Sequence, residues 1–356
     1  MRRILCALSL IGLLAAPAAA QAPTYPVVRP GVGLTFPADH GAHPAFRTEW
    51  WYATGWLRTE AGEELGFQVT FFRSRPLLAD GNPSAFAPRQ VLFAHAALSD
   101  PKRGRLLHGQ RIARQGFGLA QAAAGDADVA IDDWRLRRAS DGRFLAKAKG
   151  EGFALDLALT PTQPVLLQGQ GGYSRKGPKP EQASYYYSLP QMMVAGSVVR
   201  GGKAVKVTGV AWLDREWSST LLDPAAVGWD WVGLNLDDGG ALMAFQVRDP
   251  AGRALWTGGA YRSKAGATTR FGPGEVRFAT SRSWKSPRTG ATYPVERTVA
   301  VRLDGTERRW RLKPLFDDQE LDSRASGGPV YWEGAVSGDG ARGYLELTGY
   351  LTPMKL

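Results

Sequence analysis

The chain has 356 residues, of which 44% are hydrophobic, and it carries a formal net charge of +11 at pH 7. This length is sufficient for two domains that each bury a core. The only cysteine is Cys6, near the N-terminus, so we expect neither disulfides nor thiolate chemistry in the mature protein. The basic surplus favours anionic partners, but the basic residues are scattered and match no nucleic-acid-binding motif, which argues against nucleic acid.

Residues 1–20 have the pattern of a secretory signal peptide. Met1-Arg2-Arg3 is a basic start, residues 4–16 are apolar, and Ala18-Ala19-Ala20 fits a small-residue cleavage site. The apolar run is shorter than the roughly 20 residues that a membrane-spanning helix needs. We therefore expect cleavage after Ala20 and a soluble product that is periplasmic or secreted.

Strand signals dominate the rest of the chain. Short segments rich in aromatic and β-branched residues are separated by turn residues such as Asp238-Gly239, and no long helical period is present. These patterns predict an all-β protein built as barrels or sandwiches. The predicted strands cover residues 49–57, 65–73, 91–98, 129–137, 153–159, 205–213, 232–236, 241–248, 298–303 and 344–351.

Two clusters place acidic residues between aromatic residues. The first is Glu49-Trp50-Trp51-Tyr52, shortly after His40 and His43, and the second is Trp212-Leu213-Asp214-Arg215-Glu216-Trp217. Strand alternation sends Trp50 to one face and Glu49 to the other. An apolar setting raises the pKa of a carboxyl, so the two clusters suggest one site built from distant parts of the chain. Structural ion pairs under the aromatic rings would give the same pattern.

These blocks resemble the AttH/CrtC family. The resemblance starts with the run DHGAHPAFRTEWWYATGWL from Asp39 and spans nearly the whole mature chain. The family contains carotenoid 1,2-hydratases, kievitone-hydratase-like proteins and many secreted proteins described as hydrolases. The other matching blocks are Phe93-Ala94-His95, residues 209–217, Trp229-Asp230-Trp231 and residues 343–350.

The resemblance implies two lipocalin-like β-barrel domains in tandem. A faint internal duplication agrees with it, because Trp51 precedes Phe67-Gln68-Val69 much as Trp231 precedes Phe245-Gln246-Val247. We place the N-terminal lipocalin-like domain at residues 33–220 and the C-terminal one at residues 221–356, since Asp223-Pro224 interrupts the strand pattern. Barrels of this width hold one small apolar ligand.

The resemblance also implies cofactor-independent hydration of an alkene. This chemistry needs a neutral carboxyl that protonates carbon, aromatic faces that shelter the cation, and one admitted water. The proton donor of the family's hydratases is an aspartate shortly after an aromatic residue in a late strand, a position that Asp214 matches. Glu49 is the alternative acid. The family's His-x-Trp pair corresponds to Tyr185-Tyr186-Tyr187, so its histidine is missing here.

We predict that Asp214 and Glu49 lie at one cavity within a barrel. The substrate is expected to contact aromatic residues from several strands: Trp50, Trp51, Tyr185, Tyr187, Trp212, Trp217, Trp229 and Trp231. Polar residues are expected to support the two acids: His40, His43, Arg47, His95, Arg215 and Glu216.

His40 and His43, with Glu49 or His95, could be drawn as a zinc site. Their spacing is weakly specific, and no common face is imposed on the two imidazoles. We therefore expect no metal and no cofactor, and we assign the histidines to hydrogen bonding or proton transfer.

Two other functions stay open. One is a non-catalytic periplasmic lipid-binding or carrier protein, and the other is a secreted hydrolase. The hydrolase has little support because the chain lacks a Gly-x-Ser-x-Gly elbow and Ser218-Ser219 has no evident base. In each case we expect an apolar small-molecule or lipid partner, and we also expect peripheral contact with an anionic membrane surface. The sequence does not specify an oligomeric state.

Overall fold

The computed structural model describes residues 25–76 and 82–354, so the predicted signal peptide and Cys6 lie outside the described residues. Within this part the regular secondary structure is almost entirely β-strand, which confirms the all-β prediction. The helical elements of these residues are short 3-10 turns at Ala38–His40, Pro101–Arg103 and Arg324–Ser326. No helix in the described ranges is long and apolar enough to cross a membrane.

The N-terminal half forms a 13-stranded sheet, here called sheet A. Its strand order is β4-β3-β2-β1-β13-β12-β9-β8-β7-β6-β5, and β10 and β11 pair with β12 off this path. The strands are β1 (Thr48–Thr59), β2 (Glu64–Ser74), β3 (Val91–Ser99), β4 (Leu107–Arg114), β5 (Ala120–Ala122), β6 (Asp128–Ile131), β7 (Trp134–Arg138), β8 (Phe144–Gly150), β9 (Phe153–Thr160), β10 (Leu166–Leu167), β11 (Tyr173–Arg175), β12 (Ala183–Arg200) and β13 (Lys203–Thr220).

The C-terminal half forms a 10-stranded sheet, sheet B, in the order β17-β16-β15-β14-β23-β22-β20-β19-β18, with β21 paired to β22. Its strands are β14 (Gly228–Leu236), β15 (Ala241–Arg248), β16 (Ala254–Arg262), β17 (Thr268–Phe271), β18 (Val276–Lys285), β19 (Thr292–Leu303), β20 (Thr306–Pro314), β21 (Glu320–Asp322), β22 (Val330–Gly338) and β23 (Ala341–Leu347).

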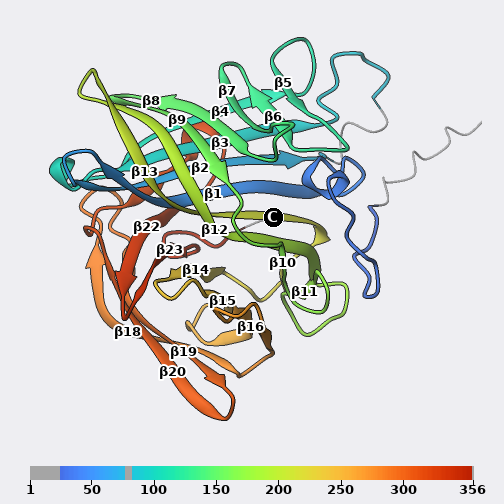
Figure 1. The fold of residues 1–356 in the computed structure, drawn as a ribbon. Coiled ribbons are helices and arrows are strands. Elements are labelled where there is room, and N and C mark those ends of the chain that lie inside the picture. The colour runs from blue at the N-terminus through green and yellow to red at the C-terminus, as the bar shows by residue number, and fades with distance from the viewer. Residues whose placement is uncertain (1–24, 77–81, 355–356) are drawn as a thin grey trace, which may run out of the picture.

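The two sheets share one topology. In each, the first strand pairs with both the second and the last strand, since β1 lies between β2 and β13 and β14 lies between β15 and β23. Sheet A curls into a nearly closed barrel, and β4 comes so close to β8 that a Cβ on Gly109 would lie 3.1 Å from Cα of Gly150. The two curved sheets lie one above the other (Figure 1). The expectation of two barrel-like units in tandem is therefore confirmed.

Strand alternation separates two faces of sheet A. On β1, Trp51, Ala53 and Leu57 point to the inside of the barrel that sheet A forms. They pack there with Leu213 and Trp217 of β13 in a buried core. Alternate residues of the same strands point outward, toward sheet B. The inside of sheet A is thus filled by its own side chains, and its outer face is available for contact with the second sheet.

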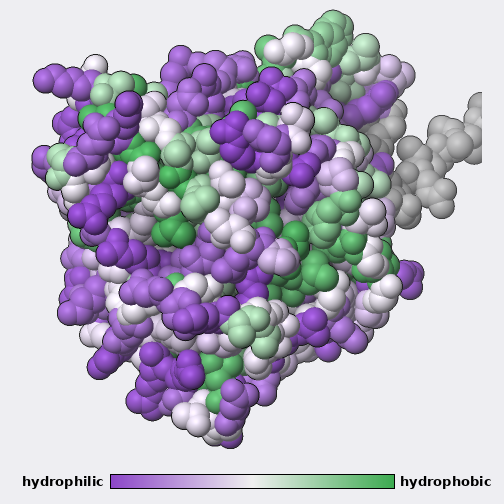
Figure 2. All heavy atoms as spheres, in the orientation of Figure 1, coloured by the Kyte–Doolittle hydropathy of each residue, from purple (hydrophilic) through white to green (hydrophobic). Residues whose placement is uncertain are grey.

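A shared apolar cluster joins the sheets. Tyr52, Trp56 and Trp212 from sheet A pack in one cluster with Phe245 and Tyr344 from sheet B. The Nε1 of Trp56 also donates a hydrogen bond of 3.0 Å to the carbonyl oxygen of Gly343. Figure 2 shows a largely hydrophilic face with hydrophobic residues near its middle, where the two sheets meet in Figure 1.

Candidate functional site

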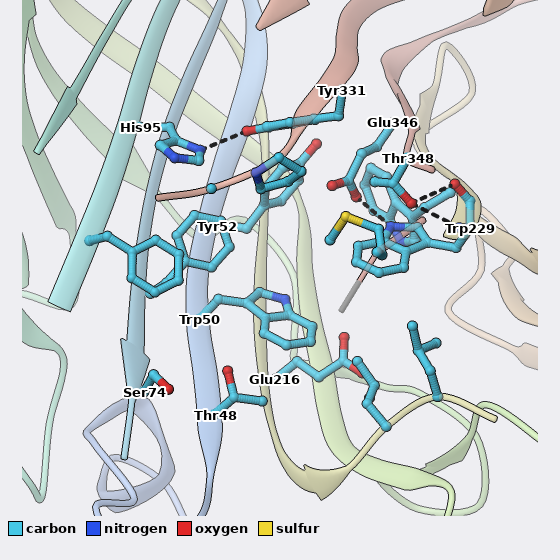
Figure 3. A pocket seen from close by; sticks show the side chains of 18 of the residues that line it. Thr48, Trp50, Tyr52, Ser74, His95, Glu216, Trp229, Tyr331, Glu346 and Thr348 are labelled. Carbon is cyan, nitrogen blue, oxygen red and sulfur yellow. Dashed lines mark hydrogen bonds between the residues drawn. The ribbon is translucent and has the colours of Figure 1, made fainter. Parts of the chain in front are cut away.

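A cavity of about 460 Å³ lies between the outer face of sheet A and sheet B. Figure 3 shows side chains of both sheets, among them Trp50, Tyr52 and Glu346, pointing into this space. The prediction of a cavity inside a barrel is wrong in this respect, because the inside of sheet A is packed with core residues. The lining residues that bear on chemistry are Trp50, Tyr52, Gln68, Phe72, Phe93, His95, Lys176, Tyr186, Asp214, Glu216, Trp229, Trp231, Phe245, Tyr331 and Glu346.

The cavity reaches the surface at one end of sheet A. Thr48 begins β1, Ser74 ends β2 and Val91 begins β3, and all three line the cavity. Ile112 of β4 also lines it and is 52% exposed to solvent. The cluster that joins the sheets borders the cavity further along the strands, at what we call its deep end, since Tyr52 and Phe245 belong to both.

Asp214 lies in the wall of the cavity and is only 3% exposed. Its Oδ1 accepts hydrogen bonds from Trp212 Nε1 at 2.6 Å and from Ser188 Oγ at 2.5 Å. Its Oδ2 accepts one from the hydroxyl of Tyr186 at 2.6 Å, and Trp231 Nε1 donates to that hydroxyl at 3.0 Å. The carboxyl is therefore fixed in orientation by neutral donors.

Burial raises the pKa of Asp214 to about 7, even though the hydrogen bonds from Ser188, Tyr186 and Trp212 lower it. Each carboxylate oxygen has two lone pairs. Both lone pairs of Oδ1 are used by donors, whereas Oδ2 accepts a single hydrogen bond. The free position that takes the proton is therefore on Oδ2, and the group is an acid poised near neutral pH.

Glu346 of β23 supplies a second carboxyl from sheet B. Trp229 Nε1 donates to its Oε2 at 3.0 Å, and no side chain of the described residues hydrogen-bonds its Oε1. Burial raises the pKa of Glu346 to about 7, and the charges of Asp214 and Glu216 add to that rise. Glu346 is half-buried and lines the cavity, so its free oxygen meets whatever the cavity holds.

Glu333 lies directly opposite Glu346 on the neighbouring strand β22. It is 1% exposed, and the hydroxyl of Tyr52 donates to its Oε1 at 2.6 Å. Burial, together with the charge of Glu346, raises the pKa of Glu333 well above its ordinary value. The environment of Glu333 therefore favours its neutral form more strongly than that of Glu346, which is half-buried.

Glu216 differs from these acids because it has a cation beside it. Lys176 Nζ lies 3.0 Å from Glu216 Oε1, and Ser184 donates to the same oxygen. The ammonium also lies 4.5 Å from the ring centroid of Tyr186 and 4.4 Å from that of Phe245. Lys176 lies in the loop between β11 and β12, and its side chain forms part of the cavity wall.

His95 and Tyr331 form a polar pair on another wall (Figure 3). The hydroxyl of Tyr331 lies 2.8 Å from His95 Nδ1 and accepts a hydrogen bond from Gln68 Nε2 at 3.2 Å. His95 Nε2 is buried and has no hydrogen-bond partner among the described residues. Burial lowers the pKa of His95 to about 3, so this residue stays uncharged.

The family of the chain is decided by its sequence match. A model described as AttH-like matches residues 27–350. This chain belongs to the AttH-like family. The prediction of an AttH/CrtC-type family is confirmed at this level, and no curated protein matches the chain.

Solved structures agree with this assignment. A crystal structure of a protein assigned as AttH from Nitrosomonas europaea is 54% identical, with a TM-score of 0.84, and covers 92% of this chain and 100% of that one. Kievitone hydratase from Nectria haematococca is 15% identical, with a TM-score of 0.65, and covers 93% of this chain and 99% of that one. At this low identity, the second likeness shows the fold alone.

Glu49 of this AttH-like protein does not lie at the cavity with Asp214, so that prediction is wrong. Glu49 is fully buried on the inner face of sheet A, where it forms ion pairs with Arg73 and Arg215. Burial alone would raise its pKa, but the guanidinium of Arg215, the hydrogen bond with His43 and the charge of Arg73 hold the pKa well below its ordinary value. Glu49 is an ionised structural residue.

The predicted aromatic wall divides by the same alternation. Trp50, Trp229 and Trp231 line the cavity. Trp212 does not line it, which corrects its predicted contact with the substrate, and instead donates a hydrogen bond to Asp214 Oδ1. Tyr186, of the run Tyr185-Tyr186-Tyr187, also lines the cavity. The others point into the core of sheet A and are corrected here: Trp51, Tyr185, Tyr187 and Trp217.

The supporting residues divide in the same way. His95 and Glu216 line the cavity, whereas Arg215 belongs to the Glu49 cluster. Arg47 precedes β1 and is not among the lining residues.

The two neighbouring histidines serve the inner network of sheet A. His40 Nδ1 lies 2.6 Å from the hydroxyl of Tyr187, and His43 stacks on Trp217 with ring centroids 3.8 Å apart. No group of three or more His, Cys, Asp or Glu side chains in the described ranges is arranged to hold a metal ion.

Sequence reasoning missed Glu346, Glu333 and Tyr331 as site residues. Each has a signal in the sequence, because a polar residue flanked by buried apolar ones on a strand must face the other way. Glu346 stands between Leu345 and Leu347, which both pack in the core of sheet B. Strand alternation within the motif Gly343 to Tyr350 thus directs Glu346 away from the core of sheet B.

Proposed function

We propose that this AttH-like protein is a hydratase-like enzyme that adds water across an isolated double bond of an apolar, isoprenoid-like or lipid-like substrate. The observation that supports this most strongly is Asp214, a buried carboxyl in the wall of an aromatic cavity. It is held by three neutral donors, and no cation among the described residues forms a salt bridge with it. A carboxylic acid that is still protonated near neutral pH is the group that alkene protonation needs.

In the first step, Oδ2–H of Asp214 protonates one alkene carbon, and the π electrons form the new C–H bond. A carbocation remains on the other carbon, and Asp214 becomes a carboxylate. The aromatic faces of Trp50 and Trp231 line the same space and stabilise the positive charge. Tyr186 keeps the carboxylate in place by donating to Oδ2.

In the second step, water attacks the cation. Glu346 comes from sheet B, while Asp214 comes from sheet A, so the two carboxyls act from different walls. The free Oε1 of Glu346 accepts a proton from the attacking water, whose oxygen forms the new C–O bond. The proton then returns to Asp214 through solvent, and the net change is the addition of one water molecule.

Incubation in D₂O with farnesol or kievitone as probe alkenes, followed by mass spectrometry, tests both steps. Wild-type protein should incorporate deuterium at carbon and form the hydrated product. Asp214→Asn should lose both by about 10²-fold or more. Glu346→Gln should lose hydration while it keeps deuterium exchange. Glu307→Gln replaces a half-buried acid of sheet B that does not line the cavity, and it should match the wild type.

Two outcomes separate the competing functions. If the wild type binds the probes and quenches its tryptophan fluorescence but incorporates no deuterium, the carrier function is the better account. If Asp214→Asn turns over like the wild type, the assignment of the acid is wrong. The hydrolase gains no support, because the hydroxyl of Ser218 donates to the carbonyl oxygen of Ala183 and neither Ser218 nor Ser219 lines the cavity.

A further inference from the structure

Exposed apolar side chains gather at the open end of the cavity. Phe86, Ile112, Phe117 and Leu119 are 71%, 52%, 61% and 44% exposed. Phe86 precedes β3, and the other three lie on β4 or just after it. The rings of Phe86 and Phe117 stack with centroids 5.5 Å apart and planes at 13°. We call these four residues the apolar rim, because a contiguous exposed apolar group of this kind marks an interaction surface.

The backbone at Phe117 is unusual. Its φ is 57°, a left-handed conformation that a bulky residue rarely adopts, and it lies between Gly116 and Gly118, whose φ angles are 95° and 73°. This geometry presents the ring outward, although a glycine would adopt it without strain. Strain that holds an aromatic ring in water indicates a functional constraint.

The charge next to the rim is positive. The guanidinium of Arg114 lies 4.3 Å from the ring centroid of Phe117 and 5.9 Å from that of Phe86. Side-chain hydrogen bonds of Arg114 and Arg89 go to the carbonyl oxygens of Ala85 and Asn82. Within the described ranges neither arginine forms a salt bridge, so both charges are available to an anionic partner.

The rim is continuous with the mouth of the cavity. Ile112 belongs to both, and Val91, which also lines the cavity, pairs with Arg114 across β3 and β4. An exposed aromatic pair flanked by arginines has the chemistry of a surface that rests in the interface of an anionic bilayer. Figure 2 shows hydrophobic residues at the top of this face, over the teal loops of Figure 1.

We propose that the apolar rim docks this protein on an anionic membrane surface, with the mouth of the cavity against the lipid. The rings of Phe86 and Phe117 enter the interface, and Arg89 and Arg114 meet the phosphate headgroups. An apolar molecule can then pass from the bilayer into the cavity without crossing water. This proposal is independent of the reaction, because a carrier would need the same access.

Co-sedimentation with vesicles tests the proposal. The wild type should bind vesicles of equimolar phosphatidylglycerol and phosphatidylcholine, bind pure phosphatidylcholine more weakly, and lose affinity as salt is added. The double variant Phe86→Ser/Phe117→Ser should lower the partition coefficient roughly tenfold or more. Met193→Ser is the matched control, because Met193 is 59% exposed but lies on β12, outside the rim.

Both replaced side chains are exposed, so the double variant should keep the circular dichroism spectrum of the wild type. Binding of the double variant at the wild-type level would overturn the proposal, as would a wild type that binds neither kind of vesicle. Sedimentation without vesicles tests whether the rim instead binds a second copy of the chain. Self-association that depends on Phe86 and Phe117, in the absence of vesicle binding, would identify a second copy of the chain as the partner instead.

Discussion

Glu49 and Asp214 lie on neighbouring strands, yet their surroundings are opposite. Glu49 faces the inside of sheet A, where Arg73 and Arg215 neutralise it. Asp214 faces the cavity, and the side chains that donate to it within the described part of the chain are all neutral. Since both carboxyls are almost fully buried, burial is not what distinguishes them. The presence or absence of a guanidinium decides whether the buried acid is ionised or protonated.

Sheet B repeats the contrast. Asp230 faces inward and bonds Arg248 Nε and Arg297 Nη2, each at 2.8 Å. The hydroxyl of Tyr350 and Gln246 Nε2 complete its four hydrogen bonds. On the other face of the same sheet, Glu346 receives a single hydrogen bond from an indole. In both sheets, the inner acid holds the sheet together and the outer acid is left available for chemistry.

The largest expected effect is on the inner side. Glu49→Gln leaves two buried guanidinium groups without a counter-charge, so we expect the free energy of unfolding to fall by about 3–5 kcal/mol. Urea denaturation measures it. Glu64→Gln removes an acid from an exposed pair with Arg342 and should change stability little. A loss as small in Glu49→Gln as in this control would break the comparison.

Asp214→Asn tests the outer side through the pH dependence of stability. The folded pKa of Asp214 is about 7, above its unfolded value, so the folded state binds the extra proton between about pH 4 and pH 7. Stability due to this group is present at low pH and is lost as pH rises through 7. The free energy of unfolding of the wild type should therefore fall by roughly 2–4 kcal/mol more than that of Asp214→Asn as the pH rises from 5 to 8. Unfolding measured at pH 5 and pH 8 would show an unchanged decline if Asp214 were ionised throughout.

Lys176→Met removes the cation that pairs with Glu216, so that Glu216 becomes a buried acid without a positive neighbour. The Glu216 carboxylate would lose the ammonium 3.0 Å away and remain buried near Asp214. We expect the free energy of unfolding at pH 8 to fall by about 1–3 kcal/mol, as for a buried group that loses its hydrogen-bond partner. Lys179→Met is the control, because Lys179 is exposed on the same loop. Equal stability of both variants would mean that the ion pair contributes nothing.

The smallest expected effect comes from Trp229→Phe, which removes the donor to Glu346 Oε2. That hydrogen bond lowers the pKa of Glu346, so its loss should raise the pKa by about half to one unit. Because a base acts when ionised, the acid limb of the rate profile should move to higher pH. Trp256→Phe, on β16, should leave the limb in place. If the acid limb of Trp229→Phe stays at the wild-type pH, Glu346 is not the group whose ionisation sets that limb.

Strand alternation accounts for what the sequence could predict. The alternating patterns gave an all-β fold, and the family motif pointed to Asp214. Alternation also places Glu49 and Trp50 on opposite faces of β1. It cannot say which face is the core and which is the site, because that depends on what packs against each face.

The pairing of β1 with β13 was the missing information. Tyr52 stands opposite Asp214, and Trp51 stands opposite Arg215. This register brings together residues about 160 positions apart, and no local pattern specifies it. The wall that sheet B contributes was harder still to predict, since Glu346 and Trp229 share a cavity with Asp214 only because sheet B docks on sheet A.

Because the cavity is bounded by both sheets, its occupancy and the docking of the sheets are linked equilibria. A ligand that fills the space adds contacts to each wall and should raise the melting temperature of the whole molecule. The converse also holds for groups that never touch the ligand. Trp56 donates to the carbonyl oxygen of Gly343 beyond the deep end of the cavity. Loss of this hydrogen bond should weaken ligand affinity, because the ligand binds only when the two sheets are docked.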